Sequence, residues 1–118
     1  SMDIVIKRTY DSPSDDDGYR VLVDRLWPRG IKKELLQIDE WNKDITPSTE
    51  LRRWFGHDPN RFEEFTVQYR VELDKNGEAQ KLLSRTAGNK RLTLLYSAKD
   101  PKINHAIILR KYLKSHQN

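Results

Sequence analysis

Two stretches of this sequence follow one scheme, and together they constrain the fold more than any other feature. In residues 20–30 and again in residues 92–105, an apolar pattern typical of a β-strand runs directly into polar and charged residues. The first stretch ends in DRLWPRG and the second in SAKDPKINH. Both patterns predict strands that deliver polar groups to one edge of a small sheet.

The strand pattern indicates a sheet that is at least partly parallel. Residues 92–96 form an apolar run broken by a single threonine, which fits a strand covered on both faces. Residues 3–8 and 19–24 alternate as strands do, and in the second of them Val21 and Val23 should face one side of the sheet and Leu22 the other.

Helical signals occupy the middle and the end of the chain. Thr46 followed by proline predicts a capped helix that runs to residue 55, and Asp58 followed by proline predicts a second one that ends at Gly77. A third helix is expected over residues 79–87. Asp100 followed by proline predicts the cap of a last helix to about residue 114.

These elements predict a small α/β domain with a partly parallel sheet flanked by helices. The domain is assigned to residues 2–118, because Ser1 before Met2 is interpreted as a remnant of expression. No run approaches the roughly 18 apolar residues of a membrane span, and no basic-then-apolar leader is present. We therefore expect a cytoplasmic protein with no membrane partner.

Composition narrows the chemistry. The absence of cysteine excludes disulfides, thiolate metal sites and thiol nucleophiles. The net charge of +4 is compatible with an anionic metabolite or a nucleic acid as partner and requires neither. The histidines are far apart in sequence, and the motifs for phosphate loops, dinucleotides and serine nucleophiles are missing, so no metal and no cofactor is predicted.

The first stretch carries Asp24, Arg25, Trp27 and Arg29 beyond its strand. Two guanidiniums beside an indole suit an anion with a flat group, such as a nucleotide. The alternative is structural: Trp27 would fill the core and Asp24 would pair with a neighbouring arginine. Both interpretations remain open at this point.

The second stretch carries Lys99, Asn104 and His105. Lys99 is expected just before a helix N-terminus, where free N–H groups favour an anion. His105 is expected in the first turns of that helix, where it could exchange protons near neutral pH. A packed, hydrogen-bonded histidine is the alternative.

His57 is a third candidate. A local hydrogen bond with the capping Asp58 would explain it, whereas convergence with His105 would favour a site.

Three motifs resemble the YeaO-like proteins, a branch of the DUF488 group of bacterial domains of unknown function. They are VLVDRLWPRG (residues 21–30), WFGHDP (residues 54–59) and LLYSAKD (residues 94–100) followed by NHA (residues 104–106). The resemblance implies a cytoplasmic α/β protein without an established activity. Members of the wider group often carry a cysteine where this chain has Asn104, so a thiol mechanism does not carry over.

Three functions follow as hypotheses. The first is a pocket for a small anionic ligand, a nucleotide or phosphorylated metabolite, at the carboxyl ends of the strands. Its ligand-binding residues would be Arg25, Trp27, Arg29, Lys99, Asn104 and His57, with Asp24 and His105 as the catalytic proton-handling pair. The second is nucleic-acid binding along a strip of scattered basic residues: Lys32, Lys33, Arg52, Arg53, Arg61, Lys90, Arg91, Arg110, Lys111 and Lys114. The third is a structural or protein-interaction domain in which Asp24, Arg25 and Arg29 are buried and paired with one another. Whether the protein is an enzyme is left open.

Overall fold

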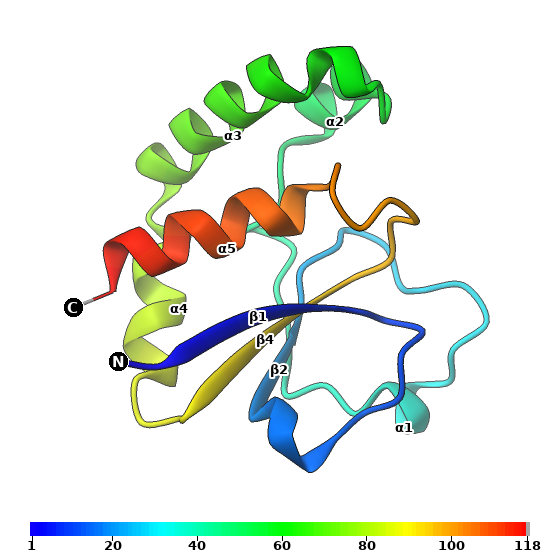
Figure 1. Ribbon diagram of the computed structural model, residues 1–118, viewed down its shortest axis with the longest axis vertical. Helices are drawn as coiled ribbons and strands as arrows, with labels where there is room; N and C mark the ends of the chain where they lie inside the picture. Colours follow the sequence, from blue (N-terminus) through cyan, green and yellow to red (C-terminus); the bar gives the residue numbers. More distant parts are fainter. Residues whose placement is uncertain (118) are drawn as a thin grey trace.

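A four-stranded, fully parallel sheet organises the protein (Figure 1). The computed structural model describes residues 1–117, and residue 118, the last of the predicted domain, lies outside them. The strands are β1 (Asp3–Arg8), β2 (Tyr19–Leu22), β3 (Glu40–Trp41) and β4 (Arg91–Tyr96), in the order β1-β4-β2-β3. The predicted α/β class is therefore confirmed.

The two stretches that dominate the sequence are parallel neighbours. Strand β2 pairs with β4 in a register that places Val21 opposite Leu94, and the Val23 N–H continues the ladder to the Leu95 carbonyl at 2.9 Å. Parallel strands end at the same edge of a sheet, so the polar segments after β2 and β4 emerge side by side. The two strands therefore deliver their polar segments to one edge of the sheet, as their patterns predicted.

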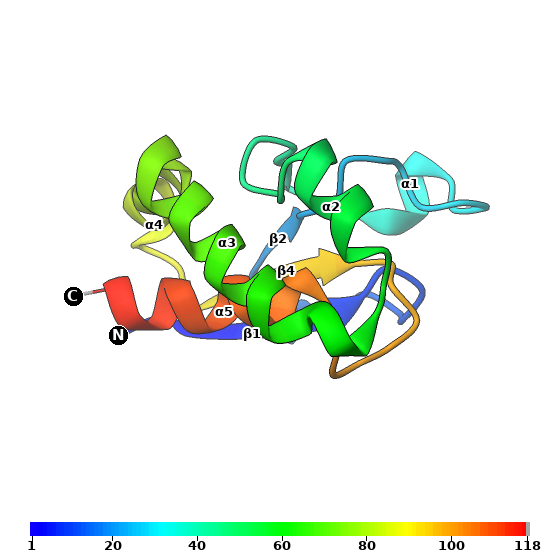
Figure 2. The ribbon, with the colours of Figure 1, turned by 90° about the horizontal axis from the view of Figure 1, so that it is seen from above.

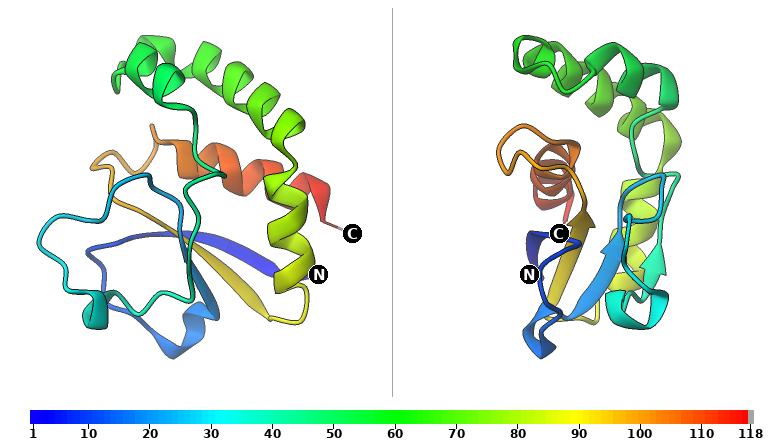
Figure 3. Two further views of the ribbon diagram at one scale, coloured as in Figure 1. Left: turned by 180° about the vertical axis from the view of Figure 1, so that it is seen from behind. Right: turned by 90° about the vertical axis from the view of Figure 1, so that its right-hand side faces the viewer.

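The two faces of the sheet bury different groups. Val21 and Val23 belong to the main core with β4 and with α3 (Phe62–Asn76), α4 (Glu78–Thr86) and α5 (His105–His116). Leu22 packs on the other face against Leu36 of α1 (Lys33–Leu36), as the alternation predicted. Helix α3 lies over α5 (Figure 2), and Figure 3 shows α5 and α1 at opposite sides of the molecule.

Two helices begin later than the sequence suggested. The N-cap of α2 (Thr49–Phe55) is Ser48, whose Oγ accepts from the Leu51 N–H at 3.1 Å, and not Thr46. Thr46 is buried and donates instead to the Lys43 carbonyl at 2.6 Å. Tertiary contact decides the difference, because Ser48 is held by Glu72 of α3 through both its N–H (2.8 Å) and its hydroxyl (2.6 Å).

The cap of α5 is Asn104 and not Asp100. Its side-chain oxygen accepts from the Ile107 N–H at 3.0 Å. Asp100 forms a separate turn by accepting from the backbone N–H groups of Lys102 (2.8 Å) and Ile103 (3.1 Å). An Asp-Pro pair starts such a turn as readily as a helix, so the local signal alone did not distinguish the two.

Two groups of paired charges join elements around the sheet. Asp17, in the short 3₁₀-helix η1 (Asp15–Asp17), binds Lys7 at 3.1 Å and the nearly buried Arg20 at 2.5 Å. Glu40 accepts from Arg85 at 2.6 and 2.8 Å, which joins β3 to α4.

In residues 1–117, none of the helices combines the length and apolar character that crossing a membrane requires.

Candidate functional site

A cavity of about 360 Å³ opens at the carboxyl edge of the sheet, beyond the ends of β2 and β4. Ligands of open α/β sheets favour this crevice. A second 3₁₀-helix, η2 (Pro59–Arg61), follows α2 beside it. The lining combines aromatic walls with charged and polar side chains: Tyr10, Asp24, Leu26, Trp27, Pro28, Arg29, Arg52, Phe55, His57, Phe65, Ser97, Ala98, Asn104 and His105.

Most of the residues predicted for the site line this cavity. They are Asp24, Trp27, Arg29, His57, Asn104 and His105. They come from the loop after β2, the turn after α2 and the start of α5, so the fold brings together three segments that are distant in sequence.

Asp24 and His105 meet at the base of the cavity. The Nε2 atom of His105 lies 2.6 Å from the Val23 carbonyl oxygen and 3.3 Å from Asp24 Oδ1. The other carboxylate oxygen of Asp24 accepts from the Ser97 N–H at 2.9 Å. Since a carbonyl can only accept, Nε2 must carry a proton and donate it. The pair therefore links β2, β4 and α5 at the point where the two strands end.

The environment of His105 favours its neutral form. Burial lowers the pKa of its imidazole below the ordinary value of 6.5, and the positive charge of Arg52 lowers this pKa further. The Asp24 carboxylate and the bond to the Val23 carbonyl act in the opposite direction but do not outweigh burial. His105 is thus a neutral imidazole near pH 7 whose Nε2 proton is already engaged.

Two arginines supply positive charge at the cavity. Arg29 is exposed, and its carbonyl accepts from the Tyr10 hydroxyl at 3.0 Å, which ties the loop after β2 to the end of β1. Arg52 reaches the cavity from α2. Among residues 1–117, neither guanidinium has a carboxylate partner or a hydrogen bond.

Sequence reasoning missed Arg52 as a site residue and counted it only among the scattered basic residues. Its position three residues before Phe55 on a helix is the signal that could have found it, because residues three apart share a helix face. Phe55 is a wall of the same cavity.

The aromatic walls have structural contacts of their own. Trp27 donates from Nε1 to the Ile31 carbonyl at 2.7 Å and meets Trp41 edge-on, with ring centroids 5.5 Å apart. Phe55 and Phe65 stack at 4.1 Å between α2 and α3. These contacts hold flat apolar surfaces in place before any ligand arrives, and Trp27 combines the structural role with a position on the cavity wall.

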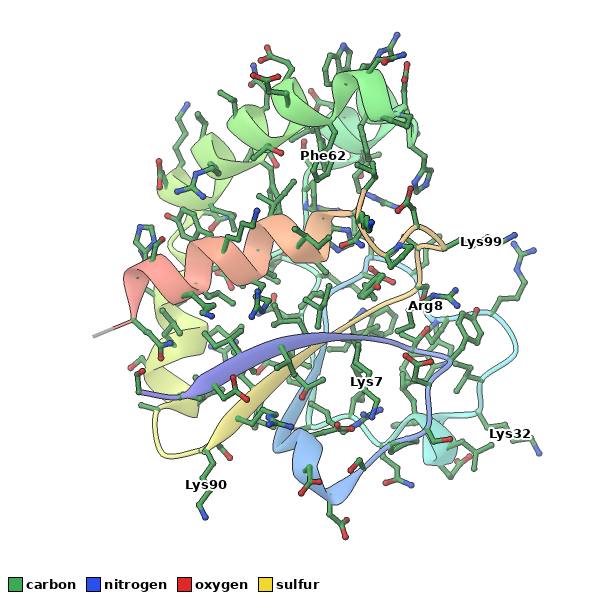
Figure 4. The ribbon with its side chains drawn as sticks, in the orientation of Figure 1. Lys7, Arg8, Lys32, Phe62, Lys90 and Lys99 are labelled. Atoms are coloured by element: carbon green, nitrogen blue, oxygen red, sulfur yellow. The ribbon has the colours of Figure 1, made fainter. Side chains whose placement is uncertain are left out.

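Arg25 and Lys99 do not line the cavity. The Nε atom of Arg25 donates to the Pro47 carbonyl at 3.0 Å, so this arginine joins the loop after β2 to the segment before α2. Lys99 is exposed and extends outward from the molecule (Figure 4). Its predicted place just before a helix N-terminus is wrong, because α5 begins only at His105.

Asn104 and His57 differ in how firmly they are held. Asn104 is buried, and besides capping α5 it donates to the Asp100 carbonyl at 2.8 Å. His57 is exposed, and its ring lies 6.0 Å from that of Phe55. Asp58 caps η2 through the Asn60 N–H at 3.0 Å, and no hydrogen bond joins it to His57 in the described chain. His57 and His105 do converge on one cavity, which was the condition for reading them as a site.

The contacts of Asp24, Arg25 and Arg29 count against the structural hypothesis, which required them to be paired with one another. Asp24, Arg25 and Arg29 are not paired with one another: Asp24 binds Ser97 and His105, Arg25 binds Pro47, and Arg29 is exposed. Over residues 1–117, no group of three or more histidine, aspartate or glutamate side chains is placed to hold a metal ion.

Comparison with known proteins agrees with the motifs in the sequence. The uncharacterized protein YeaO of Escherichia coli is 51% identical over 114 residues, which cover 97% of this chain and 99% of that protein. The uncharacterized protein Rv3073c of Mycobacterium tuberculosis is 39% identical over 108 residues, covering 92% and 91% of the two chains. Among solved structures, none matches. A family model described as the inactive DUF488-N3 subclade matches residues 3–118. The chain therefore belongs to the inactive DUF488-N3 subclade, within the group that its motifs predicted.

Proposed function

We propose that this protein binds a small organic anion in the cavity at the carboxyl edge of its sheet, without transforming it. The observation that carries the proposal is the pair of guanidiniums, Arg29 and Arg52, which line the cavity and have no partner within the described chain. Arginine side chains match phosphate and carboxylate groups with two parallel hydrogen bonds. Two such side chains at one cavity provide positive charge that an anion could neutralise.

The size and walls of the cavity indicate a small molecule with a flat apolar part. Its volume of about 360 Å³ lies near the lower end of the roughly 300–1,000 Å³ typical of small-molecule sites. The partly exposed Trp27 supplies aromatic surface on which a ring can stack, and the buried Phe55 and Phe65 add apolar wall. A nucleoside monophosphate or an aromatic phosphate meets both requirements.

A binding role fits the state of the polar groups better than catalysis does. Both oxygens of Asp24 have protein partners, and the Nε2 proton of His105 is donated to the Val23 carbonyl. The family description as inactive points the same way. The chain also offers no thiol, because it has no cysteine and Asn104 is committed to capping α5.

An enzyme using the same cavity is the second candidate. The 3.3 Å contact between Asp24 and His105 favours it, since a carboxylate beside an imidazole is a common proton-handling pair. In that case Nδ1 of His105 would be the nitrogen available to the substrate, because Nε2 is engaged.

Nucleic-acid binding receives less support. Several of the basic residues expected to form a strip have protein partners: Arg61 binds the Trp54 carbonyl, Arg91 binds Asp3, and Arg110 binds the Ile4 carbonyl. Lys32 and Lys90 extend from different parts of the molecule (Figure 4).

We retain a cytoplasmic location as part of the proposal.

The test is a thermal-shift and calorimetric titration with inorganic phosphate, phenyl phosphate, adenosine monophosphate and a short oligonucleotide. A ligand that binds only the folded state raises the free energy of unfolding, by about 2.7 kcal/mol at 100 times its Kd. We expect phenyl phosphate or adenosine monophosphate to bind more tightly than inorganic phosphate, because only they can use the aromatic walls.

Arg52→Gln should weaken binding at least about tenfold, by removing a charge-assisted contact. Arg53→Gln is the matched control, because Arg53 is the next residue of α2 and does not line the cavity. Equal losses in both variants, or the absence of any stabilising anion, would contradict the proposal. Product formation from any of the probes would instead favour the enzymatic candidate.

A further inference from the structure

His57 has a backbone conformation that is uncommon for residues other than glycine. Its φ is +57°, in the left-handed region where a side chain crowds the backbone. Gln37, with φ of +53°, is the other non-glycine residue with positive φ in residues 1–117. Glycine adopts this conformation without strain, and asparagine, aspartate and histidine adopt it more often than other residues do.

The turn that contains His57 explains the conformation and not the histidine. Helix α2 ends at Gly56, which is also left-handed (φ 54°, ψ 30°) and closes the helix through a 3.0 Å bond from its N–H to the Arg52 carbonyl. The Asp58 N–H then returns to the Phe55 carbonyl at 3.0 Å. Two successive left-handed residues connect α2 to η2, and a second glycine would serve this turn with less strain.

Side-chain contacts within the protein do not explain the histidine either. Its ring is exposed and tilted at 50° to Phe55 with 6.0 Å between ring centroids, which is a weak contact. In the described part of the chain, its ring nitrogens have no hydrogen-bond partner. His57 does line the cavity, together with Arg52 and His105.

We propose that His57 is a ligand-contacting, specificity-determining residue, kept in a strained backbone position because its ring completes the anion-binding wall of the cavity. This inference rests on the proposed function. An imidazole N–H beside Arg52 would donate to the anion that the two arginines attract, and it would fix the direction from which the anion enters. Residues held in sparsely populated backbone regions are typical of ligand clamps for this reason.

The inference predicts a trade between stability and binding that a merely structural histidine would not show. In the free protein, His57→Gly should raise the Tm by about 3–5 °C, because glycine relieves the left-handed strain. The same variant should bind phenyl phosphate about tenfold more weakly, because it loses a hydrogen bond to a charged group. His57→Asn keeps a less flexible turn than glycine, but its amide reaches only the position of Nδ1 and not that of Nε2, so it should also lose affinity.

Gln37→Gly is the matched control. Gln37 is the other left-handed non-glycine residue, caps α1 and lies outside the cavity lining. This variant should raise the Tm as His57→Gly does and leave phenyl phosphate affinity unchanged. Parallel shifts in Tm with divergent effects on affinity would separate strain relief from ligand contact.

Each other outcome overturns the inference. Suppose that the parent protein and Arg53→Gln bind phenyl phosphate and that Arg52→Gln does not. If either His57 variant then retains the parental affinity, the proposed function stands but the proposed role of His57 is wrong. A His57→Gly Tm at or below the parental value removes the claim of strain. If the parent protein binds none of the anions, the proposed function fails and this inference fails with it.

Discussion

Two regions of this protein differ in how their charged residues are paired. In the first region, Asp17 contacts Lys7 and Arg20, and Glu40 contacts Arg85, so that each charge has a partner. In the second region, at the cavity, Arg29 and Arg52 have no partner within the described chain. A charged residue therefore indicates a candidate binding surface only when it lines a cavity and lacks a partner. Paired charges indicate contacts that stabilise the fold.

The titration of the first region shows what pairing does. Burial by itself raises the pKa of Asp17, but bonds from the Ser14 N–H, Lys7 and Arg20 outweigh it and hold this pKa below the ordinary 3.8. The bonds from Arg85 hold the pKa of Glu40 below 4.5. A depressed carboxyl pKa contributes stability that is present above the unfolded-state pKa and is lost as the pH falls through the folded-state pKa. Acid should therefore weaken the first region below about pH 4.

The largest expected effect comes from removing the shared carboxylate of the first region. Asp17→Ala leaves the nearly buried Arg20 and the half-buried Lys7 without a counter-charge, and we expect it to lower the free energy of unfolding by about 3–5 kcal/mol. Urea denaturation measures this change. The control is Asp16→Ala, an exposed neighbour in η1, which should change stability by less than about 0.5 kcal/mol. Similar losses in both would show that Asp17 is not the centre of this region.

A smaller effect concerns the pH dependence of stability at the cavity. Because burial lowers the pKa of His105 in the folded state, the unfolded chain binds more protons as the pH falls below about 6.5. The free energy of unfolding should thus decrease from pH 7 towards pH 5.

His105→Gln should flatten this slope, because a glutamine amide can still donate to the Val23 carbonyl but does not titrate in this range. Denaturant titrations at pH 5, 6 and 7 measure it, and His116→Gln on the exposed end of α5 is the control. An unchanged slope in the His105 variant would mean that the imidazole is not held neutral by burial.

The smallest effect on stability is expected at the unpaired arginines. Arg29→Gln and Arg52→Gln remove charges that contact no carboxylate in residues 1–117, so each should change the free energy of unfolding by no more than about 0.5 kcal/mol. Thermal and urea unfolding measure this change. If either variant lost several kcal/mol of unfolding free energy, these arginines would stabilise the fold as the paired charges do, and the two regions would not differ.

Local and periodic signals were sufficient for most of the fold. The apolar run of β4, the alternation of Val21, Leu22 and Val23, and the helical spacing of α3 follow from side-chain periods of two and 3.6 residues, which the sequence carries directly. The predicted starts of α2 and α5 are wrong for two different reasons. Ser48 caps α2 because Glu72 of α3 holds it, and a local cap motif does not include that distant contact. At α5 the local signal was ambiguous, because Asp100 forms a separate turn and Asn104 forms the cap.

What the sequence by itself determined is therefore the α/β class, the family motifs and the convergence of two polar segments on one edge of the sheet. The tertiary structure decided which members of those segments share the cavity. It directed Arg25 and Lys99 elsewhere, and it added Arg52 from the middle of the chain, which the sequence analysis had not assigned to the site. The physical reason is that periodicity specifies which face of an element a residue occupies. Which groups meet across elements depends on packing distances that only the folded chain defines.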